Sequence, residues 1–122
     1  MRLSRRKGRV IMNQEWLNRI ITRTTEELAQ TLRDKGLEYA DADGDRLDNF
    51  KALALLQHTT PERALLGLAG KHIVALFDFA RRDAQGDDPE IPNEQWEEKT
   101  GDIIAYMVLL RAIRTERREP KI

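Results

Sequence analysis

The chain has 122 residues, no cysteine, 21 basic against 21 acidic side chains, and a hydrophobic fraction of 40%. One domain is expected at this length, and a folded chain of this size buries roughly two thirds of the surface that its unfolded form exposes. The absence of cysteine excludes a disulfide scaffold, a thiolate zinc site and a thiol nucleophile. With only His58 and His72 as further soft ligands, a bound metal is expected to be hard and oxygen-liganded, either Mg²⁺ or Mn²⁺.

Charge is unevenly distributed along the chain. Residues 1–11 carry five bases and no acid, which leaves 16 bases against 21 acids in residues 12–122. A nucleic-acid interface usually presents a basic face, so nucleic acid is an unlikely partner except through this tail. Residues 1–12 are interpreted either as a solvated basic tail or as an upstream-start extension ahead of a single domain, residues 13–119. No apolar run reaches the ~18 residues of a membrane span and no leader is evident, which favours a cytoplasmic protein without a membrane partner.

Helical periodicity governs the first half of the domain. Apolar residues recur at a helical period between residues 17 and 32, which predicts a first helix from Gln14 to about Tyr39 with Asn13 as its cap. A polar turn at residues 41–46 separates it from a second helix over residues 46–57. Strand signals are weak throughout.

Capping signals place two more helices in the second half. Thr60-Pro61 predicts the start of a helix that runs to about residue 84 and ends near Gly86. Asn93 is expected to cap a fourth helix, residues 94–118. Its segment 103–110 is apolar on every side, which predicts a central position. The fold expected is an all-α, four-helix, bundle-like antiparallel domain, and the apolar surface of its last two helices predicts a homo-oligomer.

Two carboxylates on the fourth helix are the sharpest chemical feature. Glu98 and Asp102 are four residues apart, so they share one helical face and could ligate one divalent ion. Asp102 opens the apolar segment, where an unpaired charge is costly. The alternative is therefore structural, with Asp102 paired across helices to a base such as Lys71.

The third helix offers Lys71 and His72. Lys71 lies among apolar neighbours in the sequence, and it could hold a phosphate as a point charge or neutralise Asp102. His72 falls on the adjoining face, where a packed, hydrogen-bonded histidine is the commoner arrangement. Both alternatives remain open for Lys71.

A second polar cluster surrounds the first turn. Glu38, Asp45, Asp48 and Asn49 supply more acceptors than a helix start requires, although aspartate is ordinary at a cap and in a first helical turn. The functional interpretation is a second set of oxygen ligands.

The order of these features resembles a family. Lys35-x-x-Glu38-Tyr39, Asp45-Arg46-x-x-Asn49-Phe50, Lys71-His72 and Glu98-x-x-x-Asp102-x-x-x-Tyr106 look like small phage and prophage proteins related to the MazG-like all-α nucleoside triphosphate pyrophosphohydrolases. The resemblance covers about residues 13–115. The usual acidic motifs of that family are EExxE and ExxD, whereas this chain has the spacing ExxxD and no clean EExxE.

The resemblance implies a role for each matched residue. A magnesium-dependent enzyme would cleave a nucleoside triphosphate into a monophosphate and pyrophosphate. The metal would lie on Glu98, Asp102 and Asp48, catalysis would involve Lys71 and Glu38, and the nucleotide would contact Lys71, His72, Asn49, Phe50 and Tyr106. Two alternatives compete with this enzyme: a nucleotide-binding protein of the same fold without turnover, acting as a sensor or a sponge for a nucleotide signal, and a helical homo-oligomeric interaction module.

Overall fold

The computed structural model describes residues 4–6, 9–39, 44–86 and 91–119, with side chains over residues 10–36, 44–86 and 91–119. Four helices make up the domain: α1 (Gln14–Tyr39), α2 (Asp48–Leu56), α3 (Pro61–Gln85) and α4 (Asn93–Arg118). Two short strands, β1 (Ser4–Arg6) and β2 (Arg9–Ile11), form an antiparallel pair ahead of α1. The predicted helical fold is confirmed, whereas the strand pair was not anticipated.

Local capping accounts for most of the helix boundaries. The Asn13 side chain accepts a hydrogen bond of 2.9 Å from the Trp16 amide, as expected for the cap of α1. At α3 the Thr60 hydroxyl accepts from the Arg63 amide, Pro61 opens the helix, and Gly86 closes it with a left-handed backbone at φ 69°.

The predicted cap of α4 is wrong. Asn93 is the first residue of the helix, and the extended residue before it is Pro92, which makes no side-chain hydrogen bond to the helix. Proline fixes φ near −65° and so favours the same chain entry without a capping side chain.

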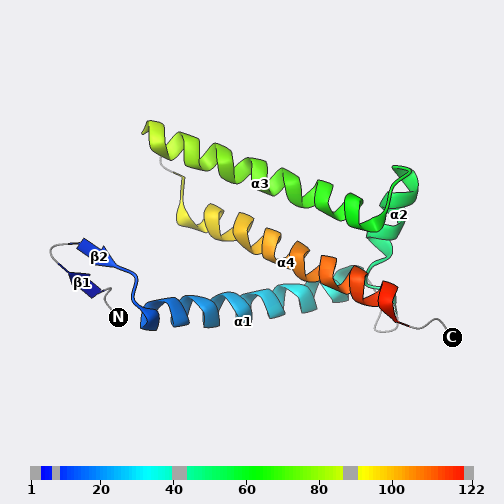
Figure 1. The fold of residues 1–122 in the computed structure, drawn as a ribbon, viewed down its shortest axis with the longest axis horizontal. Helices are drawn as coiled ribbons and strands as arrows, with labels where there is room; N and C mark the ends of the chain where they lie inside the picture. Colours follow the sequence, from blue (N-terminus) through cyan, green and yellow to red (C-terminus); the bar gives the residue numbers. More distant parts are fainter. Residues whose placement is uncertain (1–3, 7–8, 40–43, 87–90, 120–122) are drawn as a thin grey trace.

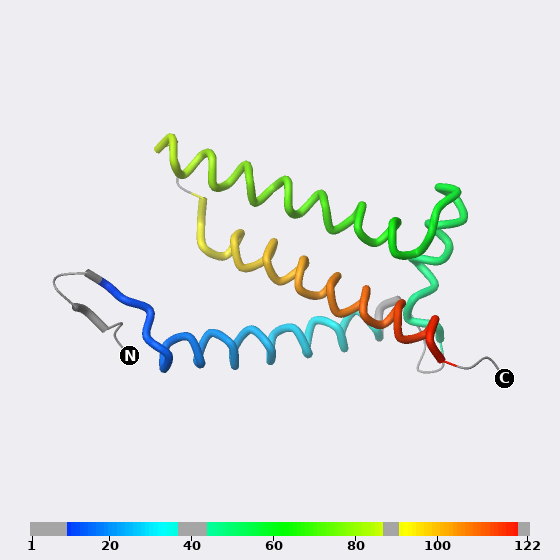
Figure 2. Tube along the Cα trace, in the orientation of Figure 1, coloured from blue at the N-terminus to red at the C-terminus, as the bar shows by residue number. Residues whose placement is uncertain are grey.

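Helix α4 is central, as its apolar sequence predicts. Figure 1 shows it between α3 and α1, and it packs against both. Helices α3 and α4 lie side by side and run in opposite directions. Helix α1 runs in the same general direction as α4 (Figure 2). Helix α3 is therefore antiparallel to both α1 and α4, whereas α1 and α4 are parallel.

The core sits where α2, the start of α3 and the second half of α4 meet. Its buried members are Leu47, Phe50, Leu65 and Ile113, with partly buried side chains of α4 packed around them. At the opposite end of the α3–α4 pair, the Phe79 and Trp96 rings meet edge to face at 5.4 Å between centroids. The segment 103–110 is only partly buried in the single chain.

Ion pairs connect the helices at the α2 end of the molecule. Glu62, at the start of α3, accepts hydrogen bonds of 2.8 Å from Arg114 and Arg117 near the end of α4. Lys51 of α2 contacts Asp45 before that helix and Glu116 of α4. These contacts fix α2, α3 and α4 relative to one another. None of the helices of the described residues is long and apolar enough to span a membrane.

Candidate functional site

An open groove of about 650 Å³ separates α1 from the first half of α4. Its walls carry five carboxylates, one guanidinium and a few apolar side chains, and we call it the acidic groove. The carboxylates belong to Glu27, Glu94, Glu97, Glu98 and Asp102. Its volume lies within the range typical of ligand sites.

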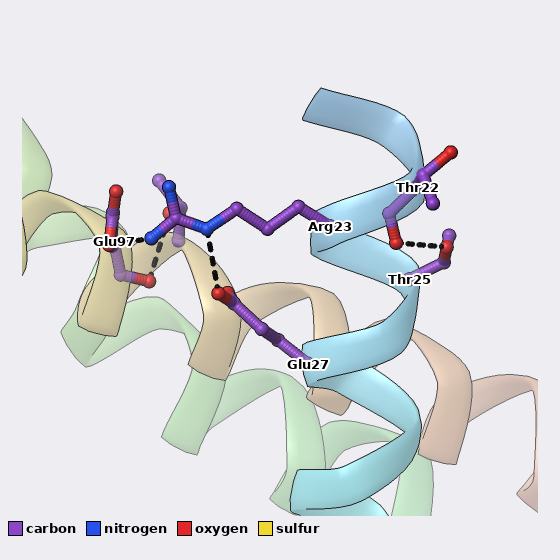
Figure 3. Close-up of polar contacts among 6 residues, drawn as sticks. Thr22, Arg23, Thr25, Glu27 and Glu97 are labelled. Atoms are coloured by element: carbon purple, nitrogen blue, oxygen red, sulfur yellow. Dashed lines mark hydrogen bonds and ion pairs between the residues drawn. The ribbon is translucent and has the colours of Figure 1, made fainter. Parts of the chain in front are cut away.

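Arg23 spans the acidic groove from α1 to α4. Its Nε donates to Glu27 at 2.9 Å and its Nη2 to Glu97 at 3.3 Å, as Figure 3 shows. The hydrogen bond that Arg23 donates to Glu27, followed by the charge of Glu97, raises the pKa of Arg23. The contact is exposed, with 65% of the Arg23 side chain accessible, so it contributes little to the stability of the α1–α4 packing.

Gly101 forms part of the groove on the α4 side. A Cβ atom at this position would meet nothing within 4 Å, so the groove reaches the α4 backbone there. A glycine inside a helix destabilises it by roughly 0.5–1 kcal/mol relative to alanine. Packing among the described residues gives no reason for this loss of stability. A ligand that lies close to the helix would give one, because glycine leaves the backbone free of a side chain.

A second cavity of about 330 Å³ lies next to the groove, and all four helices or their flanks contribute to it. It combines two cations with two aromatic rings and several polar groups, and we call it the basic–aromatic pocket. The members used below are Lys35, Arg46, Asn49, Phe50, His72, Asp102 and Tyr106. Asp102 and Thr31 line both cavities, so the two are adjacent.

Three rings contact one another along one wall of the basic–aromatic pocket. The Phe50 and Tyr106 rings meet edge to face with centroids 6.4 Å apart, and the His72 and Tyr106 rings lie 5.6 Å apart at a tilt of 36°. Phe50 is buried in the core, so the Tyr106 ring packs against a fixed side chain. A planar ligand such as a nucleobase can stack on a wall of this kind.

His72 is the basic neighbour of Asp102. Its Nδ1 lies 3.7 Å from the Asp102 Oδ2, is buried, and has no hydrogen-bond partner in the described part of the chain. A movement of about 0.5 Å would bring the two atoms within hydrogen-bond range. Across the helices Asp102 therefore lies near the His72 imidazole, and the predicted partner Lys71 lines neither cavity.

The cations of the pocket come from the two sides of the first turn. Lys35 lies near the end of α1 and Arg46 lies just before α2. The Arg46 side chain lies against the backbone of Gly36, where a Cβ atom would be 3.3 Å from its Nε. Both residues occur in the motifs that carry the family resemblance, yet no role was assigned to either from the sequence.

The structure brings several of the predicted residues together. Glu98 and Asp102 line the acidic groove, and Asn49, Phe50, His72 and Tyr106 line the basic–aromatic pocket.

Two other predicted residues, Lys71 and Asp48, line neither cavity. Lys71 is exposed on α3 and lines neither cavity, because consecutive residues of a helix point about 100° apart and His72 takes the inward direction. Asp48 is exposed in the first turn of α2, where its charge favours the helix N-terminus. The side chain of Glu38 lies outside the described residues.

No known family model, curated protein or solved structure matches this chain.

Proposed function

We propose that the chain binds a nucleoside triphosphate across the two cavities and hydrolyses it to a monophosphate and pyrophosphate. The observation that carries this proposal is the position of Asp102, which lines both a pocket with two cations and an aromatic wall and a groove rich in carboxylates. A nucleotide needs those chemistries side by side: aromatic surface for the base, cations for phosphates, and carboxylates for a phosphate-bound metal.

The donor set of the groove suits magnesium in one particular way. Mg²⁺ is usually held in phosphate-transfer sites by one or two carboxylates together with substrate phosphates and water, rather than by a cage of protein ligands. Glu98 and Asp102 are such a pair, one helical turn apart on the face of α4 that lines the groove. When bound, the ion would supply Lewis acidity toward the phosphoryl oxygens.

The chain's own side chains would orient the substrate. Lys35 and Arg46 would contact phosphate oxygens and offset their charge, while the Tyr106 ring would stack on the base. Asp102, held near His72, would present its carboxylate toward the groove. In the reaction the oxygen of a water molecule would bond to the α-phosphorus and the water would release a proton to solvent. The bond from that phosphorus to the α–β bridging oxygen would break, and pyrophosphate would leave.

The two cations of the basic–aromatic pocket favour a second candidate, a nucleotide-binding protein without turnover. Under this candidate Lys35 and Arg46 would hold the phosphates by charge alone, and the nucleotide would be sequestered unchanged.

One experiment separates the two candidates. The purified chain is mixed at stoichiometric concentration with a panel of nucleotides and Mg²⁺ or Mn²⁺, the protein is filtered away, and filtrate and heat-released ligand are analysed by chromatography. Monophosphate and pyrophosphate in the filtrate support the enzyme. Depletion of an intact nucleotide that returns on heating supports the binder, and a filtrate identical to the protein-free control contradicts both and favours the interaction module.

Two sets of variants connect the result to the site. Glu98→Gln with Asp102→Asn is expected to abolish metal-dependent turnover with the helical circular dichroism unchanged, because both carboxylates are at least partly exposed. Arg46→Ala is expected to weaken nucleotide binding about tenfold or more through loss of a charge-assisted contact. Lys71→Ala is the matched control: the structure predicts unchanged affinity, and a comparable loss would restore the phosphate role first predicted for Lys71.

A further inference from the structure

The outer face of α3 is apolar and uncovered. Leu66, Ile73, Val74 and Phe77 are exposed to 47%, 41%, 69% and 74%, respectively. Their spacing places them along one side of the helix, and we call this side the α3 seam. The opposite side of α3 packs on α4 and contains the buried Leu65 and Phe79. The single chain therefore leaves a hydrophobic stripe in water along the outer side of α3.

Two glycines lie in the same stretch of α3. A Cβ atom at Gly67 or Gly70 would meet nothing within 4 Å. Each glycine weakens a helix interior by about 1 kcal/mol relative to alanine, and the described packing of the single chain gives no reason for that cost. A second backbone that approaches α3 closely would give one, because only glycine leaves the helix surface free of a side chain.

The exposed area of the chain is also too large for its mass. The chain exposes 9757 Å², whereas a compact monomer of 14.2 kDa exposes about 6,800 Å². The total includes residues outside the described ranges, so only part of the excess of about 3,000 Å² lies on the helices; a standard protein interface takes about 800 Å² from each partner. A dimer of this chain therefore has ample surface to bury.

We propose that a second copy of this chain covers the α3 seam, with two α3 helices crossing antiparallel near Gly70 in a two-fold symmetric dimer. In such a dimer the same patch meets itself, so an apolar stripe satisfies both copies and the glycines allow the backbones to approach. An antiparallel crossing between Gly70 and Lys71 would place Arg63 of each copy opposite Asp78 of the other. Asp78 also pairs with Arg81 of its own helix at 2.6 Å, so opposite charges would gather at the rim of the interface.

Sedimentation equilibrium of the full chain tests the dimer. The wild-type chain is expected to be a dimer, and the double variant Val74→Glu with Phe77→Glu is expected to be a monomer. Its helical circular dichroism should be unchanged, because both side chains are largely exposed in the single chain. The matched control is Leu55→Glu with Leu56→Glu, which alters two side chains of α2 that are each 79% exposed and is expected to remain a dimer.

Cross-linking tests the crossing point. The chain has no cysteine, so a single Gly70→Cys variant reports one position only. Under oxidation it is expected to form a disulfide-linked dimer, while Thr22→Cys on the exposed side of α1 is expected to stay uncross-linked.

Several results would overturn the proposal. These are a wild-type monomer at high micromolar concentration, a dimer that survives Val74→Glu with Phe77→Glu, loss of the dimer in the Leu55/Leu56 variant, or cross-linking through Thr22→Cys but not Gly70→Cys. A monomer that binds phosphatidylcholine vesicles through the seam would overturn it as well.

Discussion

The two ends of the molecule are built differently. At the α2 end, the buried side chains Leu47, Phe50, Leu65 and Ile113 gather, and Glu62 fastens α3 to α4. Along the first half of α1, Leu17, Ile20 and Ile21 stay 41–50% exposed, and Arg23 makes an exposed ion pair with Glu97 of α4. The first region is held together by buried side chains, whereas the second is an open groove whose α1 wall is largely exposed.

The largest expected effect is in the core. Leu65 is the one fully buried large side chain among the described residues, at 0% exposure. Leu65→Ala is expected to lower the free energy of unfolding by about 2–5 kcal/mol, because it removes buried methyl groups and leaves a cavity. Urea unfolding measures the change. The control is Leu66→Ala, whose side chain is 47% exposed. Because Leu66 lies in the α3 seam, both variants are compared in a chain that also carries Val74→Glu and Phe77→Glu. An equal loss of stability in the two variants would contradict the assigned core.

Acid should weaken the α2 end of the molecule through Glu62. The hydrogen bonds from Arg114 and then Arg117 lower the pKa of Glu62 below its ordinary value of 4.5. A carboxyl whose pKa is lower in the folded than in the unfolded chain stabilises the fold above about pH 4.5, and that contribution disappears as the pH falls through the folded pKa. Asp45, whose pKa Lys51 lowers, adds to the same trend.

Glu62→Gln tests this assignment. The substitution is expected to reduce stability by about 1 kcal/mol at neutral pH, a modest value because the two arginines are largely exposed. It should also flatten the loss of stability as the pH falls below about 4.5, as thermal unfolding at several acidic pH values would show. Glu15→Gln, which alters an exposed pair on α1, should leave the profile unchanged. A wild-type profile in Glu62→Gln would contradict the role given to this carboxylate.

The smallest effect on global stability is expected at the groove. Arg23→Ala removes the exposed link between α1 and α4, so the melting temperature should hardly change. Hydrogen exchange should nevertheless become faster in the amides of α1 and stay unchanged in α3 and in the second half of α4. Uniform acceleration over all four helices would show that α1 is stabilised together with the α2 end and would remove the contrast between the two regions.

Much of the fold could be predicted because its signals are local. Asn13 caps α1, Thr60 and Pro61 open α3, and Gly86 closes it, each through contacts within a few residues. Pro92 was overlooked as the entry to α4 because Asn93 offered the more familiar side-chain cap. The direction of α1 relative to α4 could not be read, since it depends on how the short α2 packs, and that is decided by tertiary contacts.

The site was predicted only in part, for a related reason. Asn49, Phe50, His72, Asp102 and Tyr106 do lie around one pocket, as the motif order implied. The choice between Lys71 and His72 depends on which face of α3 meets α4, and apolar residues on both faces conceal that face in the sequence. Lys35 and Arg46 come together only through the turn between α1 and α2. Such long-range placement leaves no periodic signal in the sequence.

We propose that nucleotide binds beside Asp102, which lines both the basic–aromatic pocket and the acidic groove. The most direct test is a titration of the isotope-labelled chain with a nucleoside triphosphate and Mg²⁺, followed residue by residue through amide chemical shifts. We expect saturable shifts centred on Asn49, His72, Asp102 and Tyr106, with an affinity that Arg46→Ala lowers and Lys71→Ala leaves unchanged. Spectra without saturable shifts across a panel of nucleotides, or shifts confined to the outer face of α3, would contradict it.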